Sequence, residues 1–147
     1  MNFHDLRDAL TDAVAAGKIG VPVAMRVNLQ LADAAVNLSA ALEAVIDLAA
    51  PVLDGPPTTL NARLNNEPDQ WNVLMQTAAG KTLFVTIGKD AGRVSSMTLS
   101  VTGNHGVIRL EGAEECEPPD SRTTASSQKW QDAVENSHRQ RSVVSVS

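Results

Sequence analysis

The stretch VPVAMRVNLQL, residues 21–31, alternates between apolar and more polar side chains. Its odd-numbered positions are all apolar, whereas Arg26, Asn28 and Gln30 stand at even-numbered positions. Successive side chains of a β-strand point to opposite faces of a sheet. This period of two therefore predicts a strand with one buried face and one accessible polar face.

The segments on either side of this strand have the spacing of helices. Before it, apolar residues recur every three or four positions over residues 6–14, Asn2 can cap the helix, and Gly17 can end it. After it, residues 33–50 are rich in Ala, Leu and Glu, and Pro51 interrupts the pattern. We expect the second helix to be largely buried because its apolar surface is broad.

The middle of the chain is a series of short alternating segments. In residues 58–64, Leu60, Ala62 and Leu64 alternate with polar residues, which predicts a second strand. Four more strands are expected to form an antiparallel meander over residues 71–77, 82–88, 95–102 and 107–110, with a polar turn at residues 90–92.

The end of the chain combines a loop, a helix and an edge strand. Residues 114–126 are acidic and rich in Pro and small polar residues, and we interpret them as a solvated loop. Residues 127–140 have helical spacing, and Val143, Val144 and Val146 suggest a closing edge strand. This order of elements predicts one α+β domain over residues 1–147, with a mostly antiparallel open sheet of about six strands and helices packed on one face.

Composition excludes several classes of protein. The net charge of -5, from 12 Lys and Arg against 17 Asp and Glu, is the wrong sign for a nucleic-acid binder. The chain contains no apolar run of the roughly 18 residues that a membrane span needs, so we expect no membrane association and a cytoplasmic location. Cys116 is the one cysteine, which excludes an intramolecular disulfide and a thiolate metal site.

The chain also lacks the local patterns of catalytic and cofactor sites. Its histidines are scattered, with no second histidine two or four positions away: His4, His105 and His138. Three aspartates share one face of the first predicted helix, which we interpret as solvated: Asp5, Asp8 and Asp12. No glycine-rich phosphate loop or nucleophile elbow occurs. We predict no catalytic residue, no cofactor and no metal site in this chain.

Three segments, in order, resemble the carboxy-terminal domain of the glucose-fructose oxidoreductase/inositol dehydrogenase (Gfo/Idh/MocA) family. VAAGKIGVPV, residues 14–23, looks like that family's helix, Gly-x-Ile-Gly-x-Pro and strand. LSVTGNHGVIRLE, residues 99–111, is similar to the Gly-containing end of its meander. Residues 130–137 with residues 141–144 resemble its closing helix and short final strand.

The resemblance also implies what this chain would lack. Family enzymes carry a nucleotide-binding domain and a Glu-Lys-Pro element ahead of this region, and we expect neither here. They commonly carry an Asp and, four residues later, a His on the second helix. Aligned on Ile46 to Ala49, those two places fall on Ala40 and Ala44, which cannot transfer a proton. We therefore expect no activity from this chain by itself.

The accessible sheet face is the candidate functional surface. Its candidate residues are mainly amides, with two arginines: Arg26, Asn28, Gln30, Asn61, Arg63 and Gln76. We weigh simple solvent exposure, homo-oligomerisation, most simply as a dimer through this face, and binding of a small sugar or carboxylate by Arg26, Asn28 and Arg63. A fourth alternative is the substrate-domain subunit of a split sugar or polyol oxidoreductase, with a separate nucleotide-binding subunit supplying NAD or NADP.

Overall fold

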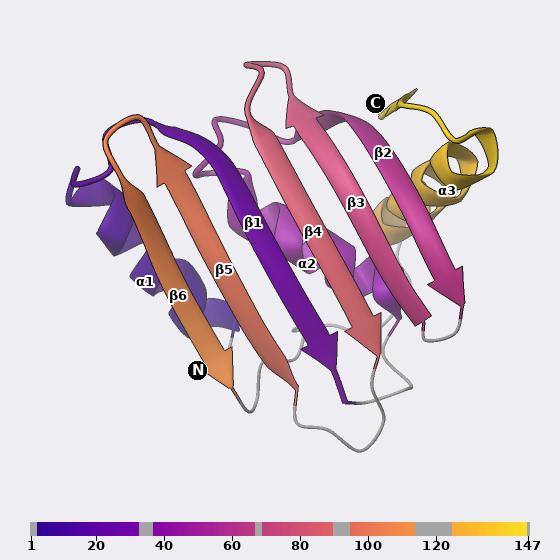
Figure 1. Ribbon diagram of the computed structural model, residues 1–147, viewed down its shortest axis with the longest axis horizontal. Helices are drawn as coiled ribbons and strands as arrows, with labels where there is room; N and C mark the ends of the chain where they lie inside the picture. The colour runs from indigo at the N-terminus through magenta and orange to yellow at the C-terminus, as the bar shows by residue number, and fades with distance from the viewer. Residues whose placement is uncertain (1–2, 33–36, 67–68, 90–94, 114–124, 147) are drawn as a thin grey trace.

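The computed structural model describes residues 3–32, 37–66, 69–89, 95–113 and 125–146 (Figure 1). Its elements follow in the order α1 (Phe3–Ala15), β1 (Pro22–Leu31), α2 (Leu38–Ala49), β2 (Pro57–Asn66), β3 (Asp69–Thr77), β4 (Thr82–Lys89), β5 (Ser96–Gly103), β6 (Val107–Ala113), α3 (Ala125–Gln140) and β7 (Val144–Ser145). The predicted helices and strands are thus present, each with shifted ends.

Within the described residues, the strands form one sheet of seven in the order β6-β5-β1-β4-β3-β2-β7. Neighbouring strands are antiparallel, except for β1 and β4, which are parallel. The predicted α+β fold with a mostly antiparallel open sheet is confirmed. The closing edge strand is confirmed as β7, which pairs with Thr59 and Leu60 of β2.

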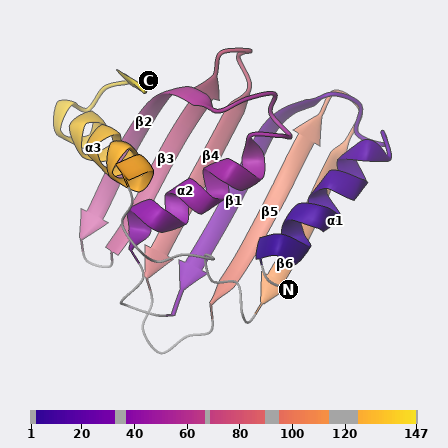
Figure 2. The ribbon, with the colours of Figure 1, turned by 180° about the vertical axis from the view of Figure 1, so that it is seen from behind.

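The helices cover one face of the sheet and leave the other open. In Figure 2, α2 crosses the middle of the sheet between α1, near β6, and α3, near β2. On β1 the side chains of Met25, Val27, Leu29 and Leu31 point into this layer and are at most 2% exposed. The alternation predicted for this strand therefore sets which of its side chains enter the core.

The start of β1 departs from the alternation. Val21 and Val23 are 56% and 43% exposed, although they share the parity of the buried residues. A register shift between Pro22 and Ala24 interrupts the pairing with β5 at this point. Such an irregularity redirects side chains locally, so the buried pattern begins at Met25.

The second helix begins later than residue 33. Asn37 caps α2, because its Oδ1 accepts a hydrogen bond of 2.8 Å from the Ser39 backbone N–H and another from the Ser39 hydroxyl. Residues 33–36 lie outside the described residues. Most of α2 is buried, as expected, since it packs on the sheet and against α3.

The turn that leads into β1 is hydrogen-bonded to the turn between β5 and β6. The Val21 N–H donates to Asn104 Oδ1 at 2.8 Å, and the His105 N–H donates to the Ile19 carbonyl at 2.8 Å. Gly20 has φ +73, and a Cβ there would lie 2.0 Å from Asn104 Oδ1. Only glycine fits this contact, which joins two of the segments that carry the family resemblance.

The predicted meander is wrong between β4 and β5. Antiparallel neighbours run from β2 through β3 to β4, but β1 lies between β4 and β5. Hydrophobic alternation identifies a strand and its buried face without specifying its neighbours, so sequence order was a poor guide here. The polar turn expected at residues 90–92 lies outside the described residues.

The last helix protects the edge of β2 beyond β7. Ser137 Oγ accepts from the Ala62 N–H at 2.9 Å, and His138 Nδ1 accepts from the Leu64 N–H at 3.1 Å. The His138 imidazole thus accepts a hydrogen bond from the strand edge. Of the predicted 114–126 loop, residues 114–124 and Cys116 with them are not described, and residues 125 and 126 begin α3.

The described residues contain neither a membrane-spanning helix nor a cluster of metal ligands. No described helix combines the length and the apolar composition that crossing a bilayer requires. In the same part of the chain, no group of three or more His, Cys, Asp or Glu side chains is arranged to hold a metal ion.

Candidate interaction surface

The six candidate residues all lie on the face of the sheet that the helices leave uncovered, hereafter the open face. The pairing registers align its side chains in rows that run across the strands. One, the Arg26 row, contains Arg109, Ser100, Arg26, Phe84, Leu74 and Asn61. The next, the Asn28 row, contains Glu111, Thr98, Asn28, Thr86, Asn72 and Arg63. Gln30 and Gln76 belong to the two outer rows.

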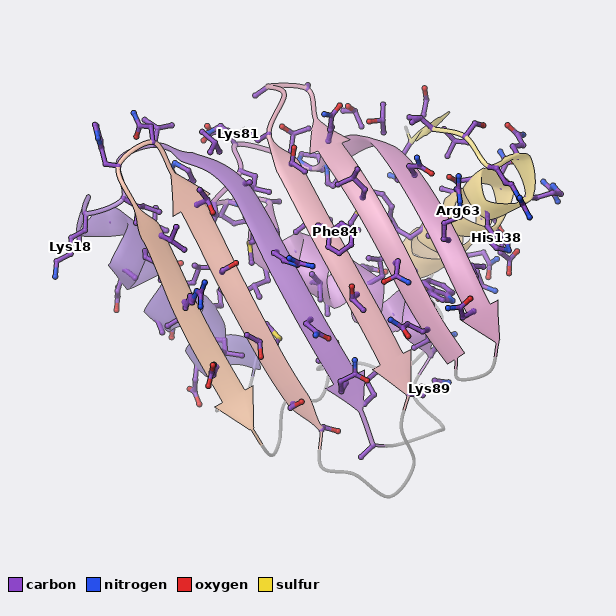
Figure 3. All side chains as sticks on the ribbon, viewed as in Figure 1. Lys18, Arg63, Lys81, Phe84, Lys89 and His138 are labelled. Carbon is purple, nitrogen blue, oxygen red and sulfur yellow. The ribbon has the colours of Figure 1, made fainter. Side chains whose placement is uncertain are left out.

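An apolar cluster occupies the centre of the open face. Phe84 lies near the middle of the exposed sheet in Figure 3, directly between Arg26 and Leu74 in the register. The guanidinium carbon of Arg26 lies 5.1 Å from the Phe84 ring centroid, and the Leu74 side chain is 43% exposed. Aromatic residues and arginines are enriched in protein interfaces, and the stacking of Arg26 on Phe84 brings the two together.

The polar groups around this cluster are bonded within the face. Gln30 Nε2 donates to Asn28 Oδ1 at 3.1 Å, and Thr86 Oγ1 donates to Asn72 Oδ1 at 3.1 Å. Arg63 Nη1 donates to Asn61 Oδ1 at 2.8 Å and to the Ala62 carbonyl at 2.7 Å. These side chains are therefore held in place before any partner binds, which lowers the entropic cost of ordering them.

The residues proposed for a small ligand do not converge. Arg26 is on β1 and Arg63 on β2, with β4 and β3 between them. Three strand spacings separate the two arginines by about 14 Å. A small sugar or carboxylate could contact Arg26 and Asn28, but Arg63 would be out of reach. The arrangement favours a broad partner over a small ligand.

The other side of the domain lacks an acid–base pair at the places that the family resemblance implies. Ala40 is buried in α2, and Ala44 is half-buried one turn later. Asp47 is exposed on the same helix. His105 is exposed in the turn before β6, and the side chain of His4 lies outside the described residues.

A separate hollow opens between α3 and β7. It is lined by Lys129, Asp132, Ala133 and Asn136 of the helix, together with residues 144–146. Its lining mixes one cation, one carboxylate, an amide and two valines without a convergent set of polar groups. We assign it no function.

Sequence reasoning missed part of the open face. The alternation of Ser96, Thr98, Ser100 and Thr102 in β5 was a sufficient signal that these residues share one face. The stacking of Arg26 on Phe84 had no comparable signal, because it depends on the parallel pairing of β1 with β4.

No family model and no curated protein sequence matches this chain. Several solved structures, however, are similar to this chain. One is a probable dehydrogenase from Thermotoga maritima. The match covers 98% of this chain and 62% of the dehydrogenase chain, with TM-score 0.72 and 14% sequence identity. Another is a myo-inositol dehydrogenase from Lactobacillus casei in complex with NAD(H) and myo-inositol. The match covers 96% of this chain and 58% of that dehydrogenase chain, with TM-score 0.72 and 17% sequence identity.

A levoglucosan dehydrogenase in complex with NADH is also similar. The match covers 99% of this chain and 65% of that dehydrogenase chain, with TM-score 0.67 and 16% sequence identity. The chain therefore spans about three fifths of the length of these dehydrogenases. The likeness is one of fold, and it agrees with the resemblance in the sequence. The chain has the fold of the sheet domain of Gfo/Idh/MocA oxidoreductases.

Proposed function

We propose that this chain is a non-catalytic interaction domain, derived from an oxidoreductase sheet domain, that self-associates through its open face. The single observation that carries the proposal is the cluster of Arg26, Phe84 and Leu74 at the centre of an uncovered sheet. Large apolar side chains left accessible at one place and rimmed by polar residues mark a contact surface.

The dimensions of the open face support this assignment. With six long strands about 4.8 Å apart and four rows about 6.7 Å apart, the face measures roughly 29 Å by 27 Å, on the order of 800 Å². A standard protein interface buries about 800 Å² on each partner. One copy of the face is therefore large enough for a stable contact with a second copy.

The experiment is the dependence of molecular mass on concentration, measured by light scattering and analytical ultracentrifugation. The wild-type chain should form a dimer, and Phe84→Glu should weaken association by at least about a hundredfold, because it places a charge at the centre of the contact. Ala15→Glu is the matched control, since it adds the same charge on α1 behind the sheet.

Two results would contradict the proposal. One is a wild-type chain that remains monomeric throughout the micromolar range. The other is a dimer that Phe84→Glu leaves intact. Circular dichroism of Phe84→Glu must first show a folded protein, and Leu74→Gln provides a milder second test of the same cluster.

A second candidate is the substrate-domain subunit of a split NAD(P)-dependent oxidoreductase. It is favoured by the nucleotide complexes among the similar structures, which this chain spans in part. A separate chain would then supply the nucleotide site and the lysine. This candidate predicts that NADH changes the melting temperature only when a nucleotide-binding chain is added, and that the mixture oxidises a polyol when NAD⁺ is supplied to accept the hydride. Inactivity of the reconstituted pair would remove it.

A further inference from the structure

The two edges of the sheet differ in how much of their backbone is covered. The outer edge of β2 is paired with β7 and, beyond β7, with side chains of α3. At the other end of the sheet, β6 is seven residues long and contains no proline or lysine, and its pairing with β5 has no register shift. Short edge strands, prolines, lysines and bulges are the features that usually prevent another strand from pairing with an edge. The edge of β6 lacks all four.

Alternate backbone groups of β6 point away from the sheet. The Gly103 N–H donates to the Gly106 carbonyl at 2.8 Å, and hydrogen-bonded pairs alternate along an antiparallel ladder. Starting from Gly106, every second residue therefore turns its N–H and C=O towards β5, and the residues between them turn theirs outward: Val107, Arg109 and Glu111. None of the described residues hydrogen-bonds to these outward groups.

Two apolar side chains at this edge are incompletely covered. The residues of β5 that face the helices are at most 1% exposed: Met97, Leu99 and Val101. Ile108 and Leu110 of β6 pair with two of them and face the same way, but they are only partly buried. Behind them, α1 packs on β6 and extends past its edge in Figure 1. One more strand beside β6 covers apolar surface that the core leaves accessible.

We infer that the edge of β6 binds an extended segment of a partner protein, which joins the sheet as an additional antiparallel strand. The segment runs opposite to β6, as β5 does on the other side. Its backbone bonds to the outward groups of β6, and its apolar side chains cover Ile108 and Leu110. This contact is separate from the self-association of the open face, because it uses backbone groups at the rim of the sheet.

Geometry excludes the β6 of a second copy as the added strand. Neighbouring strands lie about 4.8 Å apart, whereas the axes of packed helices lie about 8 to 10 Å apart. Because α1 lies behind β6 (Figure 2), antiparallel pairing of two β6 edges would bring the two copies of α1 closer than helices can pack. The other edge of a second copy is closed by β7 and α3. The edge of β6 therefore takes a segment that has no helix packed behind it.

The charges of β6 specify which segment fits. Arg109 and Glu111 lie two positions apart on the open face, and antiparallel pairing sets one side chain directly opposite another. A complementary segment carries an acidic residue opposite Arg109 and a basic residue opposite Glu111. The residues between and beside these two are apolar, because they cover Ile108 and Leu110. The sequence TVKIEVT, read antiparallel to β6, has this pattern, whereas exchanging its two charges sets like charges opposite each other.

Two peptides of identical composition test the inference. Acetylated and amidated TVKIEVT sets its lysine opposite Glu111 and its glutamate opposite Arg109, and TVEIKVT reverses the two. Fluorescence anisotropy of the labelled peptides should show that the wild-type chain binds TVKIEVT about tenfold more tightly, because both cross-strand pairs change from attraction to repulsion. The double variant Arg109→Glu, Glu111→Arg should prefer TVEIKVT. Equal affinities, a wild-type preference for TVEIKVT, or no binding of either peptide would overturn the inference.

Methylation of the peptide backbone tests strand addition directly. Antiparallel pairing directs the glutamate N–H of TVKIEVT at the Arg109 carbonyl, and it directs the isoleucine N–H away from β6. Methylation of the glutamate nitrogen should therefore abolish binding. Methylation of the isoleucine nitrogen is the matched control and should leave binding nearly unchanged. Bound TVKIEVT should also slow hydrogen exchange of the Val107, Arg109 and Glu111 amides. Equal effects of the two methyl groups, or unchanged exchange at these amides, would contradict the placement on β6.

Discussion

The two faces of one sheet are specified by different physical means, and β1 contributes to both. Leu29 points into the helix layer and is completely buried, while its neighbour Asn28 is exposed on the open face. The covered face is filled by aliphatic side chains that must match one another in volume. The open face is ordered by hydrogen bonds between neighbouring side chains and by stacking on Phe84. Stability should therefore reside on one face and association on the other.

The largest expected difference comes from paired substitutions on β1. Leu29→Ala should lower the free energy of unfolding by about 3 to 4 kcal/mol, because it leaves a cavity under the helices. Asn28→Ala should change it by less than about 0.5 kcal/mol, since the residue is on the surface. Chemical denaturation of both variants measures the difference. Similar losses in the two proteins would mean that the open face also contributes to the monomer's core.

From Met25 onward, alternation along β1 was enough to predict which residues belong to which face. It could not predict that β1 lies between β4 and β5, because side-chain parity carries no information about neighbouring strands. The candidate residues were therefore placed on the correct face without their mutual distances. The separation of Arg26 from Arg63 and the proximity of Arg26 to Phe84 both follow from strand order.

Hydrogen bonds made by side chains to distant backbone groups were equally inaccessible. His138 Nδ1 meets the Leu64 N–H across 74 positions in the chain. No local pattern marks such a pair, because the helix and the strand that carry it come together only in the folded protein. By contrast, Gly17 was recognisable as a helix stop, since a positive φ is a local requirement.

The turn that connects α1 to β1 should give the next largest change in stability. Gly20→Ala should cost about 2 to 3 kcal/mol, because it combines an unfavourable positive φ with displacement of Asn104 from the Val21 N–H. Gly17→Ala is the matched control, with φ +75 but nothing within 4 Å of the added Cβ. It should cost only about 1 kcal/mol. Equal losses in thermal denaturation would show that the contact with Asn104 adds nothing.

Substitutions of His138, which contacts the edge of β2, should have a smaller effect on stability. His138→Leu removes the acceptor of the Leu64 N–H and should cost about 1 kcal/mol. His138→Asn retains an acceptor at the δ position and should recover part of that loss. Hydrogen exchange of the Leu64 amide reports the same bond directly, with faster exchange expected in the leucine variant alone. Unchanged exchange there would mean that α3 protects this edge without the imidazole.

The smallest effect on stability is expected at the centre of the open face. Arg26→Gln removes the stacking on Phe84, a contact worth about 0.5 to 1 kcal/mol at an exposed site, and the glutamine can still cover part of the ring. The free energy of unfolding of the monomer should therefore change by less than about 0.5 kcal/mol, whereas dimer affinity should fall by about tenfold, because the arginine lies at the centre of the contact. Measuring the free energy of unfolding and the dimer affinity of this one variant separates the contributions of the two faces. A loss of stability without a loss of affinity would assign Arg26 to the fold of the monomer.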